Sequence, residues 1–365
     1  MNRLFCTSCN ASFSLDEPIW RCPCGGLLDL EFAAEFPREK IAGRAHCLWR
    51  YREAIPLRND RNIVSLGEGF TPLTEAAVYG RRVLFKQDHL CPSGSFKDRG
   101  ATALASKAKE LGIARMVEDS SGNAGCALAA YAARAGIDCE IYVPAGASGA
   151  KLAQIRAYGA VLHTVPGPRE NAGVAALKAA QTAYYASHSC NPFFFQGTKT
   201  VAYEICEQLG WRAPDTLVTP VGNGTLLLGA YIGFADLMNA GIIGRLPRLV
   251  AVQAAQCAPL YRAFREVREE IPFTAKVPTA AEGIAVANPV RARQIVEAVK
   301  TTGGEILAAG EEEIAAAWRD AGRLGFYIEP TAAAVIAGLK QYIPTTGRDE
   351  VIVAVLTGHG LKSWY

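Results

Sequence analysis

Strands and helices alternate through the middle of the chain, and this pattern restricts the possible folds more than any other feature of the sequence. Short apolar runs such as 139–143 and 161–165 are separated by Ala-rich helical stretches, and Gly136 lies where one of those helices should end. Strands that are joined by helices pair in parallel and are covered on both faces. The sequence therefore predicts an α/β fold with parallel sheets flanked by helices. A length of 365 residues is long for one core, so we expect two lobes.

The expected elements follow one another in a regular order. We predict helices at 97–111, 126–135, 151–158, 172–184, 199–209 and 226–239. We predict strands at 83–86, 116–117, 139–143, 161–165, 216–219, 249–253 and 351–356. Residues 31–62 are polar and charged, so we interpret them as a connecting segment, and 266–279 is a second polar stretch. The expected organisation is 1–30 as a small zinc-ribbon-like segment, 31–92 as a linker and the first part of a large lobe, 93–195 as a small lobe, and 196–365 as the rest of the large lobe.

Composition excludes several classes of function. Half of the residues are hydrophobic and 20% are charged, as in ordinary globular enzymes. The net charge of +3 is spread along the chain without a basic tract, so we expect neither a nucleic-acid partner nor a membrane partner. The first residues lack a signal-peptide pattern, and no apolar run is long enough to span a bilayer. In such a chain, eleven cysteines indicate reduced thiols or metal ligands, and we expect a cytoplasmic protein.

Four cysteines near the N-terminus form a two-part metal-binding pattern. Cys6 and Cys9 are followed, after twelve residues, by Cys22 and Cys24. Four thiolates on two tight turns can surround Zn²⁺ tetrahedrally, and the glycines after Cys24 allow the backbone to pass close to the sulfurs. The second pair is C-x-C instead of the usual C-x₂-C, so four buried or free thiols are the alternative. Because the segment is acidic, a structural zinc ribbon is favoured over a nucleic-acid contact.

Three loops indicate a cofactor site. Lys97 lies in the small-residue stretch 93–100, immediately before a helical run. The loops 120–125 and 220–225 each connect a strand to a helix. A lysine in such a turn can form a Schiff base, and helix N-termini offer free N–H groups to a phosphate. The alternative at Lys97 is a solvated lysine at a helix start. A nucleotide site is disfavoured, because these loops lack the lysine of a P-loop and the third glycine of a dinucleotide fingerprint.

These stretches, together with Thr-Gly-His-Gly-Leu-Lys at 357–362, resemble the threonine synthase branch of the fold-type-II pyridoxal-phosphate (PLP) enzymes. The resemblance extends from about Gly67 to the last residues and includes a GEG-TPL stretch at 67–73, which is either a loop or one wall of the substrate pocket. It implies the two-lobed fold of tryptophan synthase beta-like enzymes, pyridoxal 5′-phosphate as the cofactor, a small amino-acid substrate and a homodimer. The implied activity is that of a PLP-dependent lyase or synthase of amino-acid biosynthesis that catalyses elimination or replacement. Threonine synthase, a carbon–oxygen lyase acting on phosphates, is the nearest named activity.

The resemblance also implies roles for individual residues. Lys97 would bind the cofactor covalently and move protons at the substrate carbon, Asn123 would contact the 3′ oxygen of the cofactor, and Thr357 would contact its pyridine nitrogen. The residues that would hold the cofactor phosphate are Gly222, Asn223, Gly224 and Thr225. The residues that would hold the substrate are Ser120, Ser121, Gly122, Ala124 and His188. A simpler interpretation also exists for two of these groups, with 120–124 as a capping turn and Thr357 as the end of a strand.

Three positions depart from the family pattern. Where the family has NS-x-NP-x-R, this chain has His188 in place of the asparagine and Phe194 in place of the arginine. Leu226 replaces the asparagine that usually follows the phosphate loop. An apolar wall cannot pair a phosphate dianion, so we expect O-phosphohomoserine to be a poor substrate. Two alternatives stay open, namely a cysteate-synthase-like or dehydratase (deaminase) enzyme acting on a different amino acid, and a non-catalytic PLP- or zinc-binding regulatory protein.

Overall fold

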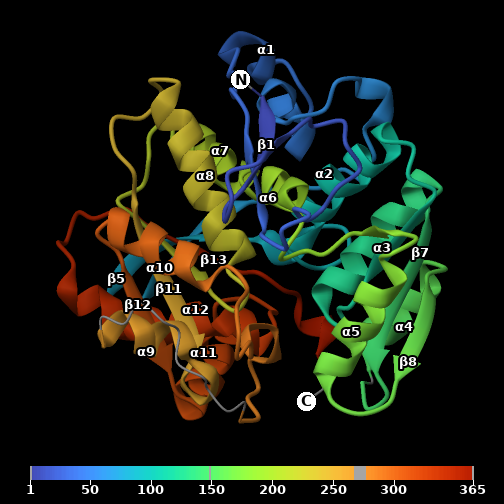
Figure 1. Cartoon of the computed structure of the whole chain (residues 1–365). Helices are drawn as coiled ribbons and strands as arrows, with labels where there is room; N and C mark the ends of the chain where they lie inside the picture. Colours follow the sequence, from blue (N-terminus) through green and yellow to red (C-terminus); the bar gives the residue numbers. More distant parts are fainter. Residues whose placement is uncertain (1, 148, 267–276, 364–365) are drawn as a thin grey trace. The chain divides into compact units, whose positions relative to one another are not determined.

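The computed structural model describes residues 2–147, 149–266 and 277–363, and the chain divides into two compact units (Figure 1). The first unit contains the residues up to Gly69 together with Lys97–Thr200, and the second contains Phe70–Phe96 and Val201–Ser363. Each unit has its own sheet and its own hydrophobic core. The polar stretch expected at 266–279 lies mostly outside the described residues. Across the described ranges, no helix combines the length and the apolar character that crossing a membrane requires.

The first unit begins with a small antiparallel sheet in the order β2-β1-β3. Its strands are β1 (Arg3–Cys6), β2 (Ser12–Phe13) and β3 (Leu28–Glu31). Leu4 and Leu28 of this sheet are fully buried, and they belong to the same apolar core as Leu104 and Leu128 from two helices of the unit. The N-terminal segment is therefore packed on the body of the first unit and shares its core.

A four-stranded parallel sheet forms the centre of the first unit, in the order β8-β7-β6-β9. Its strands are β6 (Arg115–Glu118), β7 (Asp138–Pro144), β8 (Val161–Val165) and β9 (Tyr184–Tyr185). The helices of the unit are α1 (Arg38–Ala42), α2 (Lys97–Glu110), α3 (Asn123–Ala135), α4 (Ala150–Ala157), α5 (Arg169–Ala179) and α6 (Pro192–Thr198), with 3-10 turns η1 (Leu48–Ala54) and η2 (Asp60–Asn62). Helices α3 and α5 pack on β6 and β7 (Figure 1). Parallel pairing places the carboxyl end of β6, and the loop that follows it, at one edge of this sheet.

The second unit is built on a six-stranded sheet in the order β12-β11-β10-β13-β5-β4. Its strands are β4 (Leu73–Val78), β5 (Arg81–Lys86), β10 (Thr216–Pro220), β11 (Arg248–Ala254), β12 (Glu305–Ala309) and β13 (Ile352–Val355). All neighbours pair in parallel except β4 and β5. The central strands β10 and β13 are buried along their whole length, which explains their continuous apolar sequences.

Helices cover the sheet of the second unit. They are α7 (Thr200–Gln208), α8 (Thr225–Asn239), α9 (Pro259–Arg265), α10 (Ala292–Thr301), α11 (Glu311–Arg323) and α12 (Pro330–Tyr342), with 3-10 turns η3 (Asp88–Leu90), η4 (Ala255–Cys257), η5 (Glu282–Ile284), η6 (Ile343–Thr345) and η7 (Gly360–Lys362). Helix α12 packs across β10 to β13, and α8 and α10 pack on β11. The loop from β10 to α8 therefore leaves the carboxyl end of a rigid, buried strand.

The predicted α/β fold is confirmed, and most predicted elements appear within a few residues of their expected bounds. The helix predicted at 172–184 is wrong at its end, because α5 stops at Ala179 and Tyr184 belongs to β9. Tyr184 pairs with Met116 of β6, and aromatic residues favour strands where a neighbouring strand is available. Local periodicity cannot reveal that neighbour.

Some ordered elements were not predicted. Strand β4 and helix α6 were not predicted from the sequence, and the segment 31–62 is more ordered than a simple connection. Within this segment, Trp49 is buried in a small apolar cluster, and its Nε1 donates a hydrogen bond of 2.9 Å to Oγ1 of Thr102 on α2. These contacts attach the segment to the first unit.

Candidate active site

Lys97 is the first residue of α2, and its amine has an unusual environment. The protein around this half-buried side chain disfavours the charged form and lowers the pKa of Lys97 from 10.5 to about 7, although the carboxylate charge of Glu118 acts in the opposite direction. The Nζ atom lies 5.8 Å from the centre of the Phe194 ring. A large fraction of the Lys97 amine is therefore neutral at neutral pH, as a nucleophilic lysine requires.

Glu118 is a buried acid near this lysine that the sequence analysis did not identify. It ends β6 and is fully buried, and its Oε1 lies 2.7 Å from Nδ1 of His188. Burial raises the pKa of Glu118 well above 4.5, and burial lowers the pKa of His188 well below 6.5. The imidazole is therefore uncharged at neutral pH. The available sequence signal was a glutamate that ends an apolar strand directly before the loop 120–125.

The loop 120–124 leads from β6 into α3. Gly122 occupies the N-cap position, and no side chain caps the helix, so the first N–H groups of α3 are not satisfied by a capping side chain. A Cβ atom on Gly125 would lie 2.0 Å from the carbonyl oxygen of Ser120, so only glycine allows the loop to fold back this closely. The predicted roles of Ser120, Ser121, Gly122, Asn123 and Ala124 stay predictions, and the open helix start is compatible with an anionic group such as a carboxylate.

In the second unit, the loop from β10 to α8 forms a glycine-lined helix start. Gly224 is the N-cap of α8 with a φ of +72°, and no side chain caps this helix. A Cβ atom on Gly224 would lie 2.3 Å from Cδ1 of Ile295, and one on Gly222 would lie 2.9 Å from Cα of Ile284. The loop, which continues through Asn223 to Thr225, thus brings backbone N–H groups close to whatever lies against it. This arrangement fits a phosphate.

Thr357 lies just beyond β13 in the same unit. Its hydroxyl is buried, and its Oγ1 has no hydrogen-bond partner within the described part of the chain. The backbone carbonyl of Thr357 accepts a hydrogen bond of 3.0 Å from the N–H of Phe96, one residue before Lys97. A buried hydroxyl with an unmet hydrogen bond fits a ligand with a ring nitrogen. The glycine-lined loop and this hydroxyl together fit the phosphate and the pyridine of pyridoxal phosphate.

The positions that depart from the family pattern are apolar or uncharged, as the sequence indicated. Phe194 is fully buried in α6, and its ring fills the space that a Cβ atom on Gly100 of α2 would occupy, at 2.2 Å. Leu226 is buried in the first turn of α8. The Nζ atom of Lys199 lies over the ring of Phe32, at 5.7 Å from its centre, and Lys199 therefore contacts the N-terminal segment.

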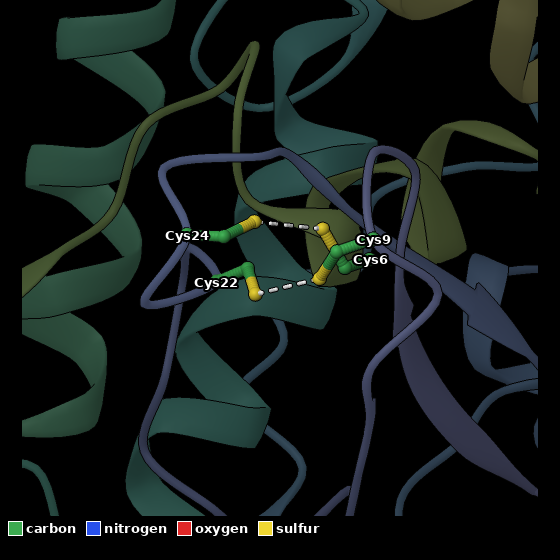
Figure 2. A group of neighbouring side chains, drawn as sticks. All are labelled: Cys6, Cys9, Cys22 and Cys24. Carbon is green, nitrogen blue, oxygen red and sulfur yellow. Dashed lines mark hydrogen bonds between the residues drawn. The ribbon is translucent and has the colours of Figure 1, made fainter.

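The four predicted zinc ligands lie together (Figure 2). Their Sγ atoms are all within 4.8 Å of one another, with Cys6 3.5 Å from Cys24 and Cys9 3.7 Å from Cys22. Four sulfurs at about 2.3 Å from a tetrahedral zinc ion would be about 3.8 Å apart, so the cluster has the size of such a site. Gly26 is needed here, because a Cβ atom on it would lie 2.5 Å from the sulfur of Cys6.

The comparison with known protein families leads to the same class of protein as these residues. Residues 64–358 match the family described as pyridoxal-phosphate dependent enzyme, and the chain belongs to that family. The family confirms the predicted enzyme class, the fold-type-II architecture and pyridoxal phosphate as the cofactor.

The most similar relatives specify the branch. The chain is 37% identical to the threonine synthase of Methanocaldococcus jannaschii, with 98% of this chain and 92% of that protein covered. It is 35% identical to the threonine synthase of Methanosarcina acetivorans, with 99% and 92% covered. Among solved structures, a threonine deaminase from the bacterium abbreviated T.th. superimposes with a TM-score of 0.67 at 25% identity and covers 81% of this chain and 94% of that one. The predicted resemblance to threonine synthases is confirmed.

Proposed function

We propose that this enzyme eliminates or replaces a side-chain substituent of a small amino acid, with pyridoxal phosphate bound covalently to Lys97. The observation that carries the proposal is the amine of Lys97, whose pKa is lowered to about 7 by its surroundings. Such an amine can attack the cofactor aldehyde at neutral pH and can later accept a proton from the substrate carbon. The threonine synthase relatives support the reaction class.

The other residues supply binding and orientation. We propose that the loop Gly222–Thr225 holds the cofactor phosphate, that Thr357 contacts the pyridine nitrogen and that Asn123 contacts the 3′ oxygen. When bound, pyridoxal phosphate withdraws electrons from the α-carbon of the substrate. The start of α3, with Ser120 and Ser121, would orient the substrate carboxylate, so that the α-hydrogen faces the Lys97 amine.

The experiment for this proposal is reduction of the holoenzyme with borohydride, followed by peptide mapping. We expect the reduced cofactor on Lys97, and we expect Lys97→Ala to bind the cofactor without a covalent bond and to lose turnover. Lys109→Ala is the matched control, because Lys109 lies on the same helix and is exposed. Covalent cofactor on a different lysine, or full turnover by Lys97→Ala, would contradict the proposal.

A second candidate concerns the substrate. Phe194 takes the position of the phosphate-reading arginine, and the neighbouring imidazole of His188 is uncharged, so neither residue offers a cation that could pair a phosphate dianion. These observations favour an amino acid with an uncharged side chain, as in a dehydratase. A comparison of kcat/KM for O-phosphohomoserine, L-threonine and L-serine tests it. Efficient threonine formation from O-phosphohomoserine would restore the plain threonine synthase assignment.

We also propose that Cys6, Cys9, Cys22 and Cys24 hold one structural Zn²⁺. The spacing of the four sulfurs and the backbone N–H of Gly26, which donates to the sulfur of Cys24 at 3.4 Å, support this proposal. All eleven cysteines lie in the described ranges as free thiols, which supports the cytoplasm as the compartment. The homodimer stays a prediction, and light scattering of the holoenzyme tests it.

A further inference from the structure

Glu118 and His188 form a buried couple that the roles described above do not use. One carboxylate oxygen, Oε1, lies 2.7 Å from the imidazole Nδ1, and both side chains are at least nine-tenths buried. The second oxygen, Oε2, is buried and makes no hydrogen bond within the described ranges. A buried carboxyl group that leaves one oxygen unsatisfied loses free energy, so its retention requires an explanation.

The couple borders the same aromatic ring as Lys97. The imidazole of His188 meets the Phe194 ring edge-on at 6.1 Å between centres, and Nζ of Lys97 lies 5.8 Å from the centre of that ring. The charge of Lys97 also acts on both Glu118 and His188. The lysine and the couple therefore lie in one neighbourhood of the first unit.

The remaining charged neighbours keep a proton on the couple. Asp119 follows Glu118 and adds negative charge, and it is held by Arg169 at 2.9 Å and by the hydroxyl of Tyr185 at 2.8 Å. Burial and the negative charge of Asp119 both raise the pKa of Glu118, whereas the cations Arg169 and Lys97 lower it. Burial has the largest effect, so the carboxyl group retains its proton at a higher pH than an exposed glutamate does.

We propose that Glu118 and His188 act as one proton-donating couple that protonates a hydroxyl leaving group of the amino-acid substrate. The inference rests on the proposed function and specifies its substrate class, a small amino acid with a side-chain hydroxyl. Hydroxide is a poor leaving group and needs a proton, whereas phosphate or chloride leaves without one. The replacement of the phosphate-reading arginine by Phe194 and the presence of this couple thus indicate the same substrate class.

The step balances without another reactant. The Lys97 amine takes the α-proton, and the electron pair of the broken C–H bond forms the new C=C bond. The C–O bond breaks with its electron pair on oxygen, the oxygen takes the proton of the couple, and water leaves. The proton then on Lys97 can return to the couple before the next turnover. The released enamine hydrolyses to a keto acid and ammonia.

The test compares leaving groups in the holoenzyme. L-Serine requires protonation of its hydroxyl, whereas β-chloro-L-alanine releases chloride without it. We expect Glu118→Gln to lower kcat for L-serine by about 100-fold or more, within the range of general acid catalysis, and to change kcat for β-chloro-L-alanine by less than about threefold. Titration of the cofactor absorbance with L-serine should give a Kd within about threefold of the wild-type value, since the carboxamide keeps the shape of the side chain.

Glu140→Gln is the matched control. Glu140 lies on the neighbouring strand β7 and also contacts a histidine, His163, at 2.9 Å, but this pair is partly exposed. We expect this variant to resemble the wild type on both substrates. If Glu118→Gln does not accumulate as folded protein, His188→Asn provides the same comparison with the residue that the family pattern has at this position.

Each result decides between the proposals. Equal losses on both substrates would show a merely structural role for the couple and overturn the inference, as would wild-type activity of Glu118→Gln on L-serine. A wild-type enzyme that processes β-chloro-L-alanine but not L-serine would contradict the inference and leave the proposed function intact. A wild-type enzyme that processes neither these compounds nor O-phosphohomoserine would contradict the proposed function itself.

Discussion

At the scale of single residues, desolvation determines the chemistry of Lys97. Its pKa is lowered from 10.5 to about 7 because the surrounding protein replaces the water that would stabilise an ammonium group, and the opposing charge of Glu118 does not compensate fully. The same physical effect acts with the opposite sign on Glu118, whose pKa is raised. Burial thus makes the base available as a neutral amine and keeps the acid protonated, so that both groups can transfer protons near neutral pH.

The lowered pKa of Lys97 predicts how cofactor uptake depends on pH. Only the neutral amine attacks the cofactor aldehyde, so the uptake rate of the cofactor-free chain should rise about tenfold per pH unit below pH 7 and level off above about pH 8. The measurement is stopped-flow absorbance between about pH 5.5 and about 9, with N-acetyl-lysine as the control, whose rate should rise over the whole range. A flat profile between about pH 6 and about 8 would show that Lys97 has no such pKa.

At the scale of elements, close backbone packing explains several glycines of the site. The first turn of α8 lies so near α10 that Gly224 has no space for a side chain, and its φ of +72° also disfavours one. The same close packing holds α2 against α6, where the Phe194 ring lies over Gly100. Helix starts that face a ligand are thus fixed by contacts behind them, which limits how far the loop can move.

The phosphate loop provides a test of this packing. Gly224→Ala should lose about 1–2 kcal/mol of unfolding free energy from backbone strain and about 1–3 kcal/mol more from the clash with Ile295, and its affinity for the cofactor should fall. Gly241→Ala is the control, because Gly241 has a φ of +70° with open space around it and should show the strain alone. Denaturant unfolding and cofactor titration measure both effects. Equal losses in the two variants would mean that the contact with Ile295 is unimportant.

At the scale of the whole molecule, the cysteine segment is an integral part of the first unit. Cys6 and Cys22 are buried in the same core as the helices of that unit. Trp20, between the two cysteine pairs, meets Tyr185 at 4.7 Å between ring centres, and Tyr185 donates to Asp119, next to Glu118. The cysteine segment therefore supports the end of β6 through two successive contacts, even though its sulfurs take no part in the chemistry.

Removal of one sulfur should separate metal binding from cofactor binding. We expect Cys22→Ser to lose its zinc and to lower Tm by about 5 °C or more, because metal binding contributes to folding free energy. The cofactor absorbance of the folded protein should persist. Cys47→Ser is the control, since Cys47 lies outside the cluster and should retain both zinc and Tm. Metal analysis, calorimetry and absorbance spectra give the three readouts, and wild-type protein without zinc would refute the metal site.

Much of the molecule was predictable because its signals are local in the sequence. The alternation of strands and helices, the cysteine spacing and the glycine-rich loops each depend on residues close together in the chain, and the fold class and the cofactor followed from them. The four cysteines could be chosen as one cluster for the same reason.

Only the tertiary structure decided the features that depend on distant residues. Tyr184 became a strand because β6 lies beside it, and Glu118 became a candidate proton donor because His188, seventy residues later in the chain, contacts it. The pKa of Lys97 likewise depends on the atoms that exclude water from its amine. Pairing, burial and desolvation are properties of a residue's surroundings, and those surroundings exist only after distant segments have come together.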